Sequence, residues 1–107
     1  MKINESYIYY IIFSDFVSGS TEEEKEEIFS GKINEFSTDT NKDFGDLIIQ
    51  VCYDLYFDKK GKCYKFKYEI YNIYGDEEIE IEDVGKECAE RLKKEITEFL
   101  LFGWYEV

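Results

Sequence analysis

Two stretches in the middle of the chain alternate apolar and polar residues, and this alternation constrains the fold more than any other feature. The odd positions of DLIIQVCYDLYFD (46–58) are apolar or aromatic, and in KCYKFKYEIYNIY (62–74) aromatic residues alternate with Lys and Glu. A period of two residues predicts strands that each have one buried and one solvated face. The intervening DKKGK is typical of a turn, so the two strands are expected to form an antiparallel hairpin.

The apolar faces of these strands also predict their register. A loop of even length gives the pairs Phe57–Tyr64, Leu55–Phe66, Tyr53–Tyr68 and Val51–Ile70. A loop of three residues would instead place Leu55 opposite Lys65 and turn one apolar face to water. In the even register Asp54 lies opposite Lys67, which is a favourable cross-strand ion pair.

A third strand is expected after a tight turn at Gly75 and Asp76. The pairs expected across this turn are Ile70–Ile81 and Asn72–Ile79. They complete a three-stranded meander, in which Ile79 and Ile81 continue the apolar face. The three glutamates that alternate with these isoleucines, which we call the acidic ladder, then point into solvent: Glu78, Glu80 and Glu82.

The acidic run STEEEKEE (20–27) predicts the start of a helix. Ser20 or Thr21 supplies a capping box with a glutamate three residues later, and the early acids suit the positive end of the helix dipole. The helix either ends at Gly31 or continues to Phe36, and the residues leave both alternatives open.

The segments on either side of that helix are expected to be a strand and a loop. SYIYYIIFS (6–14) is β-branched and aromatic with almost no polar alternation, which is typical of a central strand covered on both faces. Residues 37–46 (STDTNKDFGD) predict a polar loop.

The C-terminal part of the chain predicts an amphipathic helix that Asp83 caps. Its apolar stripe has the helical period and consists of Val84, Cys88, Leu92, Ile96, Phe99 and Leu100. Gly103 is expected to end the helix, and Trp104 and Tyr105 to fold back onto the core.

The order of these elements predicts an α+β fold in a single domain, residues 1–107. An antiparallel β-sheet of about four strands, including the three-stranded meander, carries the C-terminal helix on one face. A shorter acidic helix follows the first strand. The position of the first strand in the sheet is left open.

The sequence carries no signature of catalysis or of cofactor binding. It has no histidine, which removes the commonest general base and any His-ligated zinc. Cys52 and Cys63 are expected on the polar sheet face about 20 Å apart, too far for a disulfide or a shared metal. DTNKDFG (39–45) resembles a calcium loop, but Phe44 stands where the sharp turn needs glycine. We therefore expect no enzyme, no cofactor and no metal.

Acidic residues outnumber basic ones by 25 to 13, which gives a formal net charge of −12. This surplus attracts basic partners and repels nucleic acid and anionic membranes, so we expect neither direct nucleic-acid binding nor membrane binding. No apolar run approaches the length of a membrane span, no signal-peptide pattern is present, and the three cysteines lack framework spacing. The expected location is a reducing cytoplasm.

The acids and the tyrosines near them are the expected partner-binding residues. Alternate residues of a strand stand about 6.6–6.8 Å apart on one face, so the acidic ladder forms a row of charges spaced like successive phosphates. The candidates are Asp76, Glu77, Glu78, Glu80, Glu82 and Asp83 around the ladder, Glu22, Glu23, Glu24, Glu26 and Glu27 in the first helix, and Tyr56, Tyr71 and Tyr74 on or beside the polar face. Charges on an exposed edge strand also prevent aggregation, which is the simpler interpretation.

These observations predict a small binding protein that occupies the nucleic-acid groove of a larger basic protein. Viral inhibitors of bacterial defence, of the anti-CRISPR type, and immunity proteins that neutralise nuclease toxins are two settings for such a nucleic-acid mimic. A structural or adaptor module that self-associates through an edge strand is the alternative of a different class. A metal-dependent enzyme that uses the acids is the third class considered.

Overall fold

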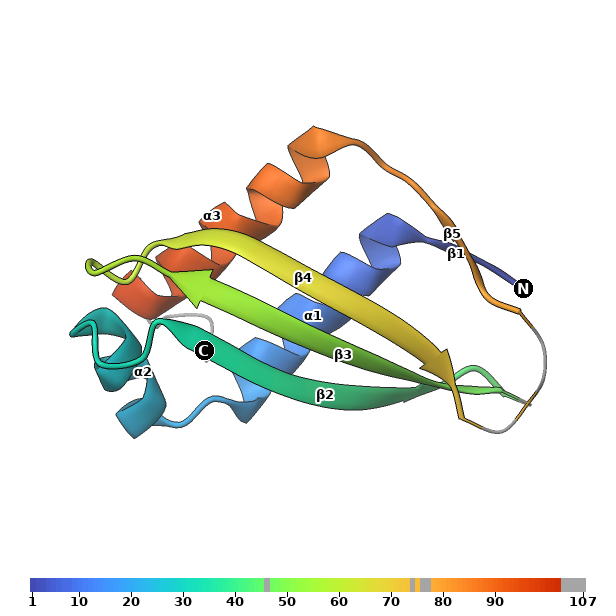
Figure 1. Ribbon diagram of the computed structural model, residues 1–107, viewed down its shortest axis with the longest axis horizontal. Helices are drawn as coiled ribbons and strands as arrows, with labels where there is room; N and C mark the ends of the chain where they lie inside the picture. The colour runs from blue at the N-terminus through green and yellow to red at the C-terminus, as the bar shows by residue number, and fades with distance from the viewer. Residues whose placement is uncertain (46, 74, 76–77, 103–107) are drawn as a thin grey trace.

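The computed structural model describes residues 1–45, 47–73, 75 and 78–102, and it has the expected α+β class. The elements in chain order are β1 (Lys2–Asn4), α1 (Glu5–Gly19), α2 (Glu22–Phe29), β2 (Glu35–Asp43), β3 (Ile48–Phe57), β4 (Cys63–Asn72), β5 (Glu80–Glu82) and α3 (Lys86–Phe102). A three-stranded antiparallel sheet in the order β2-β3-β4 has α1 and α3 on one face, and β1 pairs with β5 in a separate two-stranded sheet (Figure 1).

The central hairpin has the expected register over most of its length. Leu55 lies opposite Phe66, and Asp54 lies opposite Lys67. The pairing shifts between Tyr56 and Phe57, so Phe57 lies opposite Cys63 and not opposite Tyr64. Because of this shift Cys63 is buried at the end of the hairpin, and the expectation that it stands on the polar face was wrong.

The segment 6–14 is helical, so the prediction of a central strand was wrong. The Asn4 side chain accepts a hydrogen bond from the Ser6 amide and caps α1. The buried residues of α1 are Ile8, Ile11, Ile12 and Phe16, which recur at the spacing of a single helix face. The tyrosines between them made the segment look uniformly apolar, but Tyr7 and Tyr10 lie on the exposed side of the helix.

Residues 35–43 form strand β2, so the expected loop at 37–46 was also wrong. β2 pairs antiparallel with β3 over its whole length. Its inner face carries Phe36, Thr38 and Thr40, which lie opposite buried residues of β3. Threonine is a good strand former, but it counts as a polar residue in a sequence pattern. For this reason the alternation of inward-facing and outward-facing residues in β2 was not recognised. The meander of the fold is therefore β2-β3-β4 and not the expected run from the hairpin into residues 78–82.

The strand β5 leaves the main sheet and pairs with the N-terminus. Its partner is β1 in a parallel pair, in which Ile3 lies opposite Ile81 and Lys2 lies opposite Glu80. The expected pairs Ile70–Ile81 and Asn72–Ile79 were wrong. Asp76 of the proposed turn lies outside the described residues.

The helices α2 and α3 were both predicted from the sequence, and only the start of α3 differs from its predicted position. Thr21 and Glu24 form the complete capping box that begins α2. The helix ends at Phe29, before Gly31, whose φ of +85° suits glycine; this decides between the two alternatives for its end. α3 begins at Lys86, so Asp83 does not cap it. Gly103, Trp104 and Tyr105 lie outside the described residues.

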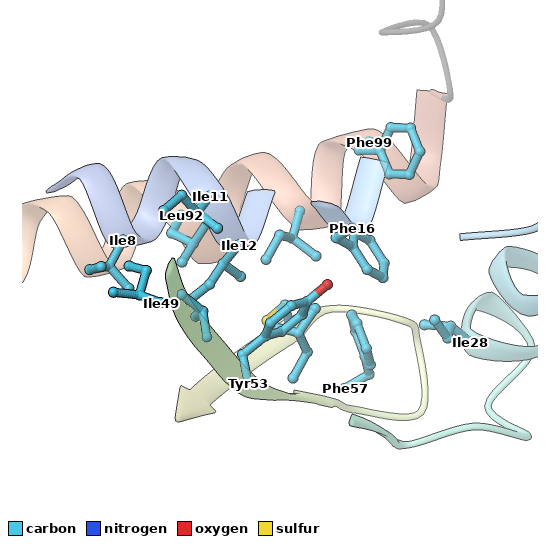
Figure 2. Packing of buried hydrophobic residues seen from close by; sticks show 14 of the residues in the cluster. Ile8, Ile11, Ile12, Phe16, Ile28, Ile49, Tyr53, Phe57, Leu92 and Phe99 are labelled. Carbon is cyan, nitrogen blue, oxygen red and sulfur yellow. The ribbon is translucent and has the colours of Figure 1, made fainter. Parts of the chain in front are cut away.

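The hydrophobic core lies between the inner face of the sheet and the two long helices (Figure 2). Phe16 of α1 is its centre, because its ring contacts the rings of Phe36, Phe57 and Phe99 from three other elements. Of the expected stripe in α3, Leu92, Ile96 and Phe99 are fully buried, whereas Val84, Cys88 and Leu100 are half-buried. No helix of the described residues covers the opposite face of the sheet (Figure 1).

Candidate interaction surface

The acidic ladder faces solvent, as expected. Glu78, Glu80 and Glu82 are exposed, whereas Ile79 and Ile81 between them pack against the core. The parallel pairing of β5 with β1 holds this alternation, because buried Ile3 lies beside Ile81. The glutamates make no ion pair within 4.0 Å to any residue that the structure describes. Their outward direction was therefore predicted correctly, although the neighbouring strand was not.

Two of the chain's own cations lie close to the acidic ladder. Lys2 stands opposite Glu80 in the β1–β5 pair. The N-terminal ammonium of Met1 donates a hydrogen bond to the Glu78 carbonyl oxygen at 3.0 Å, and the Glu80 amide donates to the Met1 carbonyl at 2.8 Å. These cations offset part of the negative charge of the ladder. Asp83, which is exposed and directly follows β5, adds to that negative charge. Asp76, Glu77 and Tyr74 lie outside the described residues.

The acidic block of α2 does not join the ladder in one surface. Figure 1 shows α2 and β5 at opposite ends of the long axis of the molecule, which measures 42 Å. Two of these acids also make contacts within the helix or at its cap. The Glu24 carboxylate accepts a hydrogen bond from the Thr21 amide, and Glu22 forms an ion pair with Lys25 at 2.7 Å. Glu23 and Glu26 are exposed, and Glu27 is half-buried.

Two of the predicted tyrosines lie on the outer face of the main sheet. The Nζ atoms of Lys65 and Lys67 lie 5.2 and 5.8 Å from the centroid of the Tyr56 ring. The pKa of the Tyr56 hydroxyl is raised by burial and then by the nearby Glu35 carboxylate. The Tyr71 hydroxyl donates a hydrogen bond to Glu69, which raises the pKa of Tyr71. These tyrosines belong to the β2-β3-β4 sheet, whereas the ladder belongs to the β1–β5 pair. The described residues that were predicted to bind a partner therefore lie in three separate places: the main sheet, the β1–β5 pair with Asp83 after it, and α2.

Sequence reasoning missed a further group of carboxylates on the same outer face. Because 37–46 was expected to be a loop, Asp39 was not placed on any face. It lies opposite Cys52, which in turn lies opposite Glu69 on β4. The Gln50 side chain donates a hydrogen bond to Asp39 at 2.8 Å. The alternation of Phe36, Thr38 and Thr40 with polar residues was the signal that could have revealed this row.

Two of the cysteine thiols have raised pKa values, and the buried Tyr53 joins two elements of the fold. Burial raises the pKa of the Cys63 thiol to about 11, and burial together with Asp39 raises that of Cys52, so both thiols stay protonated at neutral pH. The Tyr53 hydroxyl donates a 2.6 Å hydrogen bond to Asp15, which ties β3 to α1. Among the described residues no three His, Cys, Asp or Glu side chains gather to hold a metal ion.

No protein-family model matches the chain, and neither do curated proteins or solved structures. Within the described residues, no helix has both the length and the apolar character required to cross a membrane.

Proposed function

We propose that the protein is a small acidic inhibitor that binds the nucleic-acid groove of a larger basic protein. It acts without catalysis and without a cofactor. The acidic ladder stands in for successive phosphates, and lysine or arginine side chains of the groove bind it as they would bind a nucleic-acid backbone. The proposed setting is a reducing cytoplasm, in which a viral inhibitor of a bacterial CRISPR-type defence system would work.

The observation that carries this proposal is the exposure of Glu78, Glu80 and Glu82 in a row, free of ion pairs to described residues. Isoleucines that pack on the core alternate with them, so the row is held in place by the fold. Because the backbone of the row is already ordered, binding costs it little further backbone entropy. The net charge of −12 favours approach to any cationic groove.

The proposal is tested by capturing partners from the native host on the immobilised protein and on a variant with Glu78, Glu80 and Glu82 all changed to Lys. A matched control changes Glu69, Glu90 and Glu98 to Lys, since these surface residues belong to β4 and α3, are not among the candidate binding residues and carry the same total charge. The ladder variant is expected to lose a basic partner that the control retains. If both variants lose it equally, the net charge and not the ladder is responsible.

Salt dependence provides the second part of this test. If three contacts each release a counterion as on B-DNA, affinity falls by up to roughly 40-fold between 50 and 200 mM salt. An affinity that does not change over this range would contradict binding through the ladder. An immunity protein against a nuclease toxin would show the same behaviour, and the identity of the captured partner separates the two settings.

A further inference from the structure

Among the residues that the structure describes, none pairs as a strand with the outer edge of β2. The strand β2 is the first in the order β2-β3-β4, so one side bonds to β3 and no described strand lies on the other. The Phe57 amide donates to the Asn34 carbonyl at 2.9 Å and the Phe44 amide donates to the Leu47 carbonyl at 2.7 Å. In an antiparallel pair such bonds recur at every second residue, so the even-numbered residues of β2 bond to β3. The residues whose backbone N–H and C=O groups face the free edge are Glu35, Ser37, Asp39, Asn41 and Asp43.

These five residues also carry the charge of the strand's outer face. Three of them are carboxylates at every fourth position, Glu35, Asp39 and Asp43, and all three are exposed. Their α-carbons are about 13 Å apart along the strand. A segment that paired with this edge would therefore meet free backbone groups and a negative charge at the same positions.

A second copy of the chain brings no cation to these carboxylates in any antiparallel register of β2, and in one register it opposes like charges. An antiparallel pair of two β2 strands centred on Asp39 would place Asp39 opposite Asp39 and Glu35 opposite Asp43. Directly opposed like charges destabilise a strand pair. The same charges favour a segment that carries cations at the matching positions.

We propose that β2 is a docking edge for an extended, basic segment of another protein, which adds to the sheet as a fourth antiparallel strand. Main-chain hydrogen bonds to the five edge residues supply affinity, and Lys or Arg at every fourth position of the segment pairs with the three carboxylates. At the Asp43 end, the rings of Tyr7 and Phe44 contact each other edge to face and offer apolar surface beside the strand. This surface is separate from the acidic ladder and does not depend on it.

The test uses a short synthetic peptide of alternating threonine and valine in which every fourth residue is lysine. Binding is measured by calorimetry and by the hydrogen exchange of the β2 amides. We expect the amides of Ser37, Asp39 and Asn41 to gain protection, because they face the incoming strand. The same peptide with N-methylated lysine amides keeps every charge but loses these hydrogen bonds, and is expected to bind at least about tenfold more weakly. Equal binding of the two peptides, or no binding of either, would overturn the proposal.

Protein variants supply the matched controls. Ser37→Pro removes an N–H that points to solvent, so the fold is expected to survive while peptide affinity falls about tenfold or more, and Ser37→Ala is expected to bind like the wild type. Asp39→Asn should weaken binding and Glu80→Gln should not, although both remove one charge. If Glu80→Gln weakens it as much, net charge explains the binding and the edge does not. Should Ser37→Pro reduce thermal stability, the N-methylated peptide decides the question on the wild-type protein.

Discussion

The helical state of residues 6–14 is open to a sharp test with two alanine substitutions in the same segment. Ile12 is fully buried, with 0% of its surface exposed, whereas Tyr10 is 58% exposed. The two positions are two residues apart, so a strand would direct both side chains to one face, and a central strand would bury both. A helix separates them by about 200° and places them on different sides.

The expected magnitudes follow from this burial. Ile12→Ala leaves a cavity in the core and should lower the free energy of unfolding by about 2–5 kcal/mol. Tyr10→Ala removes mostly exposed surface and should change it by about 0.5 kcal/mol or less. Urea unfolding followed by circular dichroism measures both variants, and an unchanged m-value shows that the comparison is valid. A loss for Tyr10→Ala as large as that for Ile12→Ala would refute the helix.

Three further predictions concern the interior. Tyr53→Phe removes the partner of Asp15 and should cost about 1–3 kcal/mol in urea unfolding; no loss would show that this hydrogen bond is not formed. Burial raises the pKa of Tyr9 from 10.0 to about 12, so its stabilising contribution is complete below about pH 10 and is lost as the pH rises towards 12. Thermal melts across that interval should therefore fall more steeply for the wild type than for Tyr9→Phe, and parallel curves would contradict this. A thiol reagent should modify Cys52 in the native protein and buried Cys63 only after unfolding; early modification of Cys63 would argue against the shifted pairing at Phe57.

The parts of the fold that the sequence predicted correctly are those with strong local patterns. The β3–β4 hairpin has strict alternation, and a wrong register would have exposed an entire apolar face. The capping box of Thr21 and Glu24 and the long apolar stripe of α3 are likewise local signals. In each case the residues that determine the element lie within a few positions of one another.

The parts that were missed depend on distant contacts or on residues of mixed character. SYIYYIIFS suits a strand by composition, and only its continuation to Phe16 reveals the spacing of one helix face. Thr38 and Thr40 pack inward on β2 but count as polar in a pattern. The parallel pairing of β5 with β1 joins residues almost eighty positions apart, which no local signal specifies.

The same distinction applies to the candidate surface. The outward direction of the acidic ladder needed only the alternation with Ile79 and Ile81, so it was predictable. The separation of the ladder from the acids of α2 depends on the whole topology, so the sequence could not predict it. The row of carboxylates on β2 could not be predicted either, because that segment was expected to be a loop.

Competition on the partner tests the proposed mimicry most directly. Once a basic partner has been captured, its labelled nucleic acid is bound to it and the protein is added in increasing amounts, with the Glu78, Glu80 and Glu82 to Lys variant as the control. We predict that the wild-type protein displaces the nucleic acid completely and that the variant does not. A stable ternary complex of partner, nucleic acid and protein would contradict the proposed mimicry.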